Sequence, residues 1–157
     1  MAKILTKISY GADDLFKVGT FDQDTDDDAD FYAIDLVTQL AVDAAFERRV
    51  TVNLTSDGLG NIVELKSEPA GVESQNLGEG APITRISTGI QVGRLIAEVL
   101  FLKEPPDPSS ERQGSTKDPV TVFLCQSAYV SGHRVVLTLA DSGDITGVVK
   151  QRILQRE

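Results

Sequence analysis

The sequence has 157 residues, of which 41% are hydrophobic and 25% are charged, and its formal net charge is −9. A chain of this length can bury a core without disulfide bonds or metal ions, so we expect one domain over residues 1–157. Residues 1–80 contain 16 acidic and 6 basic residues, whereas residues 81–157 contain 8 and 9. The acidic first half argues against a nucleic-acid partner, because phosphate backbones are bound by clustered Lys and Arg.

The cysteine content and the hydropathy of the sequence indicate where in the cell the protein is expected. The single cysteine, Cys125, excludes an intramolecular disulfide bond, and its apolar neighbours are typical of a buried strand. The longest apolar run, residues 95–102, is interrupted by Glu98 and is too short to cross a membrane. Charged and polar residues begin too early at the N-terminus for a signal peptide. We therefore expect a cytoplasmic protein or an assembled particle such as a virion, with no membrane partner.

In chain order, the first expected element is a strand over residues 2–10, followed by an acidic loop over residues 19–30. This loop leads into the clearest predicted helix, over residues 28–48. Apolar residues at three- and four-residue spacing predict the face of this helix that packs on the core, namely Ala33, Val37, Leu40, Ala41 and Ala44. The other face is polar and contains Asp35, Gln39, Asp43 and Glu47.

The middle of the chain is expected to contain a β-hairpin over residues 50–65, with its turn at residues 57–61. Residues 67–82 and 104–119 are rich in Pro and Gly and are predicted to be two long exposed loops. Between these loops, residues 86–103 fit either a strand with a bulge at Gly93 or a helix that begins at Arg94.

The last part of the sequence is rich in β-forming residues. Residues 120–130 and 134–140 are predicted to form a second hairpin around a tight turn at residues 131–132. Residues 145–156 fit either a strand or a helix, and we find no internal repeat. The sequence thus predicts an α+β fold in which a mainly antiparallel sheet of two hairpins carries one amphipathic helix on a face.

The most conspicuous local pattern is a series of aspartates at alternate positions, which includes Asp22, Asp24, Asp26 and Asp28. Their spacing is similar to the start of a calcium-binding EF-hand loop, but Asp27 stands where the loop needs glycine and Ala33 where it needs glutamate. We interpret them mainly as a solvated acidic loop. No cofactor is expected.

Two other patterns have simple structural interpretations. Asp141, Ser142 and Gly143 match the Asp-Ser-Gly of aspartic proteases, but no second such triplet occurs, and a turn is the better interpretation. His133, the single histidine, is expected at an exposed hairpin turn and cannot form a zinc site without further ligands.

Two functions of different classes follow from these patterns. The first is a non-enzymatic structural or assembly protein, a homo-oligomer or part of a larger protein assembly. Its most concrete version is a bacteriophage-type virion component such as a capsid, connector or tail part. The alternative is a small binding or adaptor module that uses the acidic loop, residues 22–30, for a cation or a basic partner. An enzyme ranks third.

Overall fold

The computed structural model describes residues 3–11, 13–71, 74–76, 80–91, 93–102 and 111–154. The two helices of these residues are α1 (Leu36–Arg48) and α2 (Pro119–Ser131). The strands before α2 are β1 (Ile4–Gly11), β2 (Phe16–Asp22), β3 (Asp27–Tyr32), β4 (Val50–Ser56), β5 (Ile62–Gly71), β6 (Ser74–Asn76), β7 (Ala81–Gln91), β8 (Arg94–Leu102) and β9 (Glu111–Thr116). Those after it are β10 (Arg134–Leu139), β11 (Ile145–Gln151) and β12 (Ile153–Leu154).

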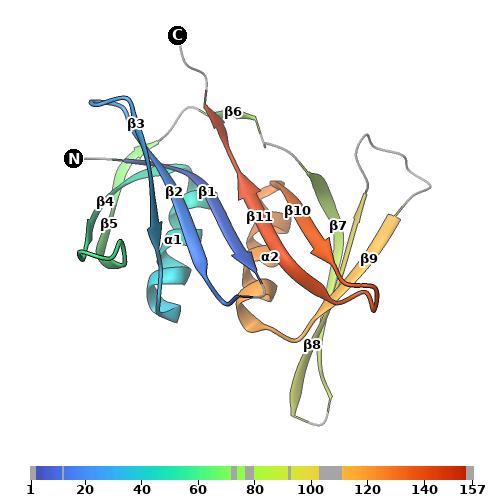
Figure 1. Cartoon of the computed structure of the whole chain (residues 1–157). Helices are drawn as coiled ribbons and strands as arrows, with labels where there is room; N and C mark the ends of the chain where they lie inside the picture. Colours follow the sequence, from blue (N-terminus) through green and yellow to red (C-terminus); the bar gives the residue numbers. More distant parts are fainter. Residues whose placement is uncertain are drawn as a thin grey trace.

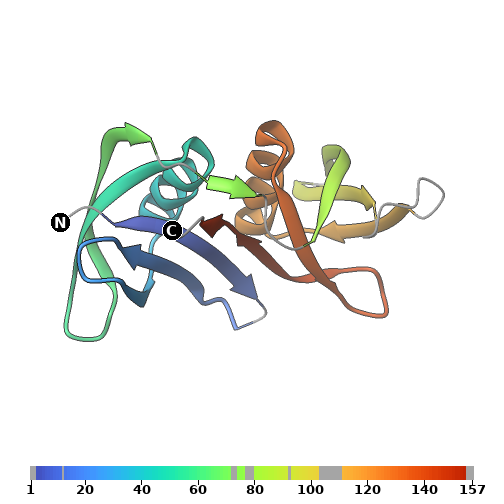
Figure 2. The same cartoon turned by 90° about the horizontal axis from the view of Figure 1, so that it is seen from above.

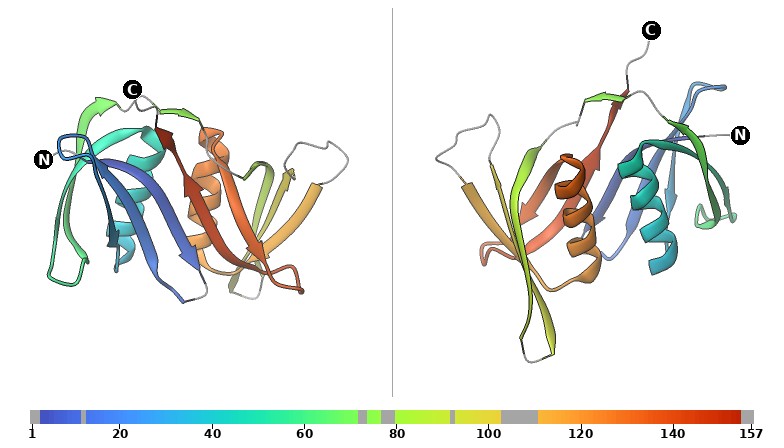
Figure 3. Two further views of the ribbon diagram at one scale, coloured as in Figure 1. Left: turned by 45° about the horizontal axis from the view of Figure 1, so that its top comes forward. Right: turned by 180° about the vertical axis from the view of Figure 1, so that it is seen from behind.

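An antiparallel sheet of eight strands, in the order β3-β2-β1-β11-β10-β7-β8-β9, forms the main layer. Both helices lie on one face of this sheet, side by side (Figures 1 and 2). The β4–β5 hairpin stands beside α1, at the opposite end of the molecule from β8 and β9 (Figure 3). The fold is therefore α+β with a mainly antiparallel sheet, as predicted, although it has two helices rather than one and more hairpins than expected.

Helix α1 begins eight residues later than the sequence suggested. Residues 27–32 form β3, which pairs with β2 along its whole length, so the acidic segment is a hairpin rather than a loop. The helix starts after Asp35, whose side chain accepts a hydrogen bond from the backbone N–H of Thr38 at 2.8 Å. This N-cap supplies a start signal that the run of earlier aspartates obscures.

The predicted core face of α1 is wrong. Val37 and Leu40 are 77% and 45% exposed, whereas Asp43 is only 4% exposed and Gln39 is also buried. The polar row faces inward because a buried lysine and a buried histidine contact it there. Amphipathic spacing identified the helix but could not reveal that its charged face had partners inside the protein.

Helix α2 occupies a segment predicted to be a strand, so the second predicted hairpin is wrong. Asp118 caps its first turn by accepting a hydrogen bond from the N–H of Val120 at 2.9 Å, and Pro119 occupies the first helical position. Gly132 ends the helix in the left-handed conformation, with φ of 74°. The buried residues recur at helical spacing and are Thr121, Val122, Leu124, Cys125 and Ala128.

The two predicted long loops contain strands. Strand β5 continues to Gly71 and β7 begins at Ala81, and β9 occupies residues 111–116. Residues 72, 73 and 77–79 of the first predicted loop and residues 104–110 of the second lie outside the described residues. Gly93, with φ of 74°, belongs to the turn between β7 and β8 rather than to a bulge or a helix. Residues 145–151 form β11, which resolves the last ambiguity in favour of a strand.

The element order shows an internal repeat that the sequence analysis did not find. Strands β1, β2 and β3, helix α1, and strands β4 and β5 form the first repeat; β7, β8, β9, α2, β10 and β11 form the second in the same order. The irregularities also coincide. Bulges occur at Leu5/Lys7 and Ile83/Arg85, and isolated bridges join Tyr32 to Asn61 and Ser115 to Asp144.

Sequence identity between the repeats supports the same conclusion. Residues 5–11, Leu-Thr-Lys-Ile-Ser-Tyr-Gly, correspond to residues 83–89, Ile-Thr-Arg-Ile-Ser-Thr-Gly, 78 positions later. Residues 35–62 align with residues 118–145 at a separation of 83, and nine of the 28 positions are identical, including both N-cap aspartates and the turn glycines Gly60 and Gly143. The chain therefore consists of two copies of one structural unit.

The orientation of α1 gives a first testable prediction, for which the helix offers two valines. Val42→Asp places an unpaired carboxylate at a fully buried position and should cost a large part of the roughly 5–15 kcal/mol that stabilises a domain. Val37→Asp, at an exposed position, should change stability by about 0.5 kcal/mol or less. Urea denaturation followed by circular dichroism measures both, and equal effects would contradict this orientation.

Candidate functional site

The structure disperses the predicted metal ligands along the β2–β3 hairpin. Asp22 is buried at the end of β2 and accepts a hydrogen bond from the N–H of Asp24 at 2.9 Å, while Asp26 lies in the turn and Asp28 on β3. Among the described residues, no three His, Cys, Asp or Glu side chains are grouped to hold a metal ion. Cation binding by this hairpin stays a prediction, which a calcium-dependent rise in the melting temperature would test.

Cys125 and His133 are both buried. Cys125 lies inside α2 rather than on a strand, and burial raises the pKa of its thiol to about 12. His133 was expected at an exposed turn, but it comes directly after Gly132, the cap of α2, and only 1% of it is exposed. The Asp-Ser-Gly triplet lies in the turn between β10 and β11, as predicted. Of these residues, only His133 joins a larger polar group.

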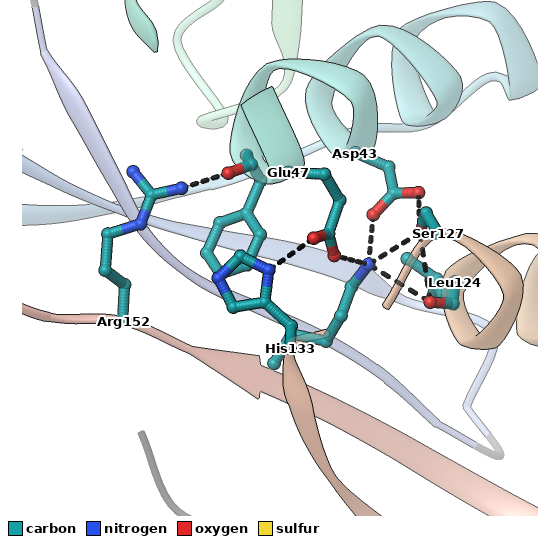
Figure 4. A network of polar contacts seen from close by, with 8 residues as sticks. Asp43, Glu47, Leu124, Ser127, His133 and Arg152 are labelled. Carbon is teal, nitrogen blue, oxygen red and sulfur yellow. Dashed lines mark hydrogen bonds and ion pairs between the residues drawn. The ribbon is translucent and has the colours of Figure 1, made fainter. Parts of the chain in front are cut away.

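The centre of that group is Lys150 of β11, whose side chain has no exposed surface (Figure 4). Its Nζ donates hydrogen bonds to Glu47 Oε1 at 2.6 Å and to Ser127 Oγ at 2.9 Å. It also contacts a carboxylate oxygen of Asp43 and the carbonyl oxygen of Leu124, the latter at 3.1 Å. Two residues of α1 and two of α2 thus surround one ammonium group.

The remaining members extend this buried polar cluster along α1. Glu47 contacts Nδ1 of His133, and the His133 ring lies 5.4 Å from that of Phe46 between centroids. Arg152 contacts the carbonyl oxygen of Phe46, and its guanidinium lies 4.7 Å from the centroid of the same ring. The polar row of α1 is therefore paired with Lys150 of β11 and with His133, and Arg152 contacts the backbone of the same helix.

The two carboxylates respond differently to burial. Burial raises the pKa of Asp43 above its ordinary value even though Lys150 and Ser127 act in the opposite direction. Burial alone would also raise the pKa of Glu47, but hydrogen bonds from His133 and Lys150 lower it overall. Lys150 contacts both carboxylates, so removing it would leave Asp43 and Glu47 buried without their shared cation.

The cluster lies where the two repeats meet, a contact that we call the internal joint. It comprises the pairing of β1 with β11 and the packing of α1 against α2. Tyr10 of the first repeat donates a hydrogen bond to Asp118 of the second at 2.7 Å, and the rings of Phe16 and Phe123 stack across it with centroids 6.5 Å apart. The internal joint is therefore a strand ladder with a charged centre and apolar surroundings.

Several strand edges are open in the described residues. The outer edges of β3 and β9 end the eight-stranded sheet, β5 has β4 as its strand partner, and β10 pairs with β7 through Ala81 and Pro82 only. The edge of β7 that faces away from β8, from Arg85 onward, and the outer edge of β5 thus have no strand neighbour in this part of the chain, although their counterparts β1 and β11 pair with each other. Open edges of this kind are places where a further strand can pair.

Apolar surface accompanies these edges on the helical face. Tyr129 and Val130, near the end of α2, are 46% and 84% exposed. Beside α1, a hollow of about 470 Å³ is lined by Ala44, Ala45, Arg48, Val50, Ser67 and Glu68. Both ends of the molecule thus combine a free strand edge with features suited to protein contact.

Comparison of the chain with protein-family models, with curated proteins and with solved structures found no match. The structure is therefore interpreted from its own geometry. No helix in the described ranges is both long and apolar enough to cross a membrane.

Lys150 provides a second testable prediction. Lys150→Met removes the cation and leaves Asp43 and Glu47 buried without it, which should reduce the free energy of unfolding by about 3–5 kcal/mol. Lys17 is a matched control, because its pair with Asp30 at 3.5 Å is exposed, and Lys17→Met should cost about 1 kcal/mol or less. Chemical denaturation compares the two, and equally small losses would show that the cluster does not hold the repeats together.

Proposed function

We propose that this chain is a non-enzymatic structural protein that assembles with other protein subunits into a ring, tube or connector. A bacteriophage-type virion component is its most concrete version. The observation that carries this proposal is the pair of free strand edges, β5 and the later part of β7, at opposite ends of one molecule. A subunit with an open edge at each end can bind a neighbour on both sides.

The surface chemistry near the edges supports assembly. Tyr129 and Val130 of α2 are exposed apolar side chains on the helical face, and the hollow beside α1 has an apolar part formed by Ala44, Ala45 and Val50. Exposed apolar groups of this kind are typical of protein contacts, and aromatic residues are enriched in them.

The buried polar cluster supports a structural role rather than a catalytic one. Lys150 is enclosed by acceptors from α1 and α2, and the carboxylates that contact it are 5% and 8% exposed. Because Lys150 and these carboxylates already contact one another, they join the two repeats and do not face a substrate. The chemistry of the cluster is therefore used to set the relative position of two units.

The mass of the protein in solution tests the proposal. Sedimentation velocity over a wide range of concentrations should show species larger than the 16.9 kDa monomer, and their share should rise with concentration. A protein that stays monomeric at the highest concentration would contradict an assembly function.

A further inference from the structure

We propose that a second copy of this chain binds head to tail, with residues 85–89 of β7 in one copy paired to residues 64–68 of β5 in the next. This inference rests on the proposed assembly function and specifies its contact. Each repeat contributes the same two edges, yet the described residues contain a single internal joint.

The internal joint fixes the register of the proposed ladder. Strand β1 pairs antiparallel with β11, with Lys7 opposite Gln151 and Gly11 opposite Gly147. Residues of β1 correspond to those of β7 at a separation of 78, and residues of β5 to those of β11 at a separation of 83. The same pairing between copies places Arg85 opposite Glu68 and Gly89 opposite Glu64.

Charge complementarity favours this register. Arg85 faces the carboxylate of Glu68, and Ser87 faces Lys66, so no like charges lie opposite one another. In the internal joint the ladder continues with a hydrogen bond from the N–H of Arg152 to the oxygen of Thr6, at 2.8 Å. The residue that corresponds to Arg152 is Pro69, which has no N–H, so the proposed ladder ends at Glu68.

The hollow beside α1 is the vacant counterpart of a filled site. Its lining residues correspond, 83 positions later, to Ser127, Ala128, Ser131, His133, Lys150 and Gln151. In the second repeat, Phe46 and Glu47 of α1 contact this set through His133 and Lys150. In the first repeat the corresponding surface is open and forms a hollow of about 470 Å³.

The residues that would fill this hollow are on α2 of the adjacent copy. Phe46 and Glu47 correspond to Tyr129 and Val130, which are exposed. The residues that line the hollow differ correspondingly from those of the second repeat. Val50 stands at the position of His133, and Ser67 stands at the position of Lys150. The contact between copies therefore lacks the histidine and the lysine of the internal joint. The exposed Tyr129 and Val130 of one copy would meet a hollow whose apolar residues are Ala44, Ala45 and Val50 and whose polar residues are Arg48, Ser67 and Glu68.

A second pair of corresponding surface hollows shows that the second repeat lacks a strand that the first repeat has beside it. A surface hollow that includes Ser9, Tyr10 and Gly11 is completed by residues 146–149 of β11. Its counterpart includes Ser87, Thr88 and Gly89 and is lined by β7 and β8 residues alone. A Cβ atom added at Gly11 would lie 3.7 Å from the oxygen of Thr146, whereas one at Gly89 would meet nothing within 4 Å. A β5 strand from another copy would supply the missing wall.

The strands that pair in the internal joint determine the kind of assembly. Strand β1 pairs with β11, whereas the corresponding strands β7 and β5 do not pair with each other and lie at opposite ends of the molecule (Figure 3). A two-fold rotation would form both pairings, so the operation that relates the repeats is not a two-fold rotation. Repeating it from copy to copy gives a heterologous contact, which produces a closed ring or an open filament.

The first test uses two exposed apolar residues on the whole chain. Val130→Asp should weaken self-association at least about tenfold, because it removes an apolar side chain from the proposed contact with Ala44, Ala45 and Val50 and puts there a carboxylate that must lose its hydration. Leu59→Asp is the matched control, since Leu59 is 82% exposed and lies in the β4–β5 turn outside the contact. Sedimentation velocity measures association, and circular dichroism checks that both variants fold.

The second test is a charge exchange across the ladder. Arg85→Glu and Glu68→Arg should each weaken association, because like charges then lie opposite one another. The chain that carries both changes should recover it, since the pair is restored with its signs reversed. Glu68 also contacts Asn53 within its own chain, so folding is checked for each variant.

The outcomes separate this inference from the proposed function. Loss of association in Val130→Asp but not in Leu59→Asp, together with recovery in the double charge variant, supports the contact. A wild-type protein that assembles while Val130→Asp and both single charge variants assemble equally well overturns the contact but leaves the assembly function intact. A wild-type monomer at all concentrations overturns both.

Discussion

The burial of one lysine ammonium constrains much of this structure. Lys150 has no exposed surface, and an ammonium group removed from water is stable only where acceptors replace its hydration. The acceptors come from two helices in different repeats, Asp43 and Glu47 on α1 and Ser127 and Leu124 on α2. The position of β11, the rotation of α1 and the distance between the helices must all agree for this one group to be satisfied.

The same requirement explains why α1 turns its polar row inward. Rotating the helix to bury Val37 and Leu40 would remove Asp43 and Glu47 from Lys150 and His133 and leave those two buried groups without their carboxylate partners. The apolar gain of two side chains is about 1.5–3 kcal/mol each, which is comparable with the cost of one uncompensated buried charge. The apolar residues on the other face are then free to serve contacts outside the chain.

Local signals in the sequence predicted part of this architecture. The α+β class, the β4–β5 hairpin and the Asp-Ser-Gly turn follow from alternation and turn residues close together in the chain. The Asp118-Pro119 pair and Gly132 were sufficient to indicate α2, but the β-branched residues between them favoured a strand. The polar cluster could not be predicted, because Lys150 and Asp43 are 107 residues apart and only the fold brings them together. The repeat was detectable in the sequence, in residues 5–11 and 83–89.

If the internal joint and the proposed contact between copies were identical, any first repeat could pair with any second repeat, within a chain or between chains. The differences between the two repeats decide which of these pairs forms. At the internal joint, substituting α2 for α1 would place Val130 where Glu47 stands and leave Lys150 without one of its acceptors. At the hollow of the first repeat, substituting α1 for α2 would place Glu47 opposite Val50 and Ser67, so it would lose His133 and Lys150, the two side chains that contact it in the internal joint. Each exchange removes a partner from a charged group, which costs more than a mismatch of apolar shapes. The charged joint thus fixes which repeats pair within a chain, and the proposed contact between chains uses the surfaces that this joint leaves open.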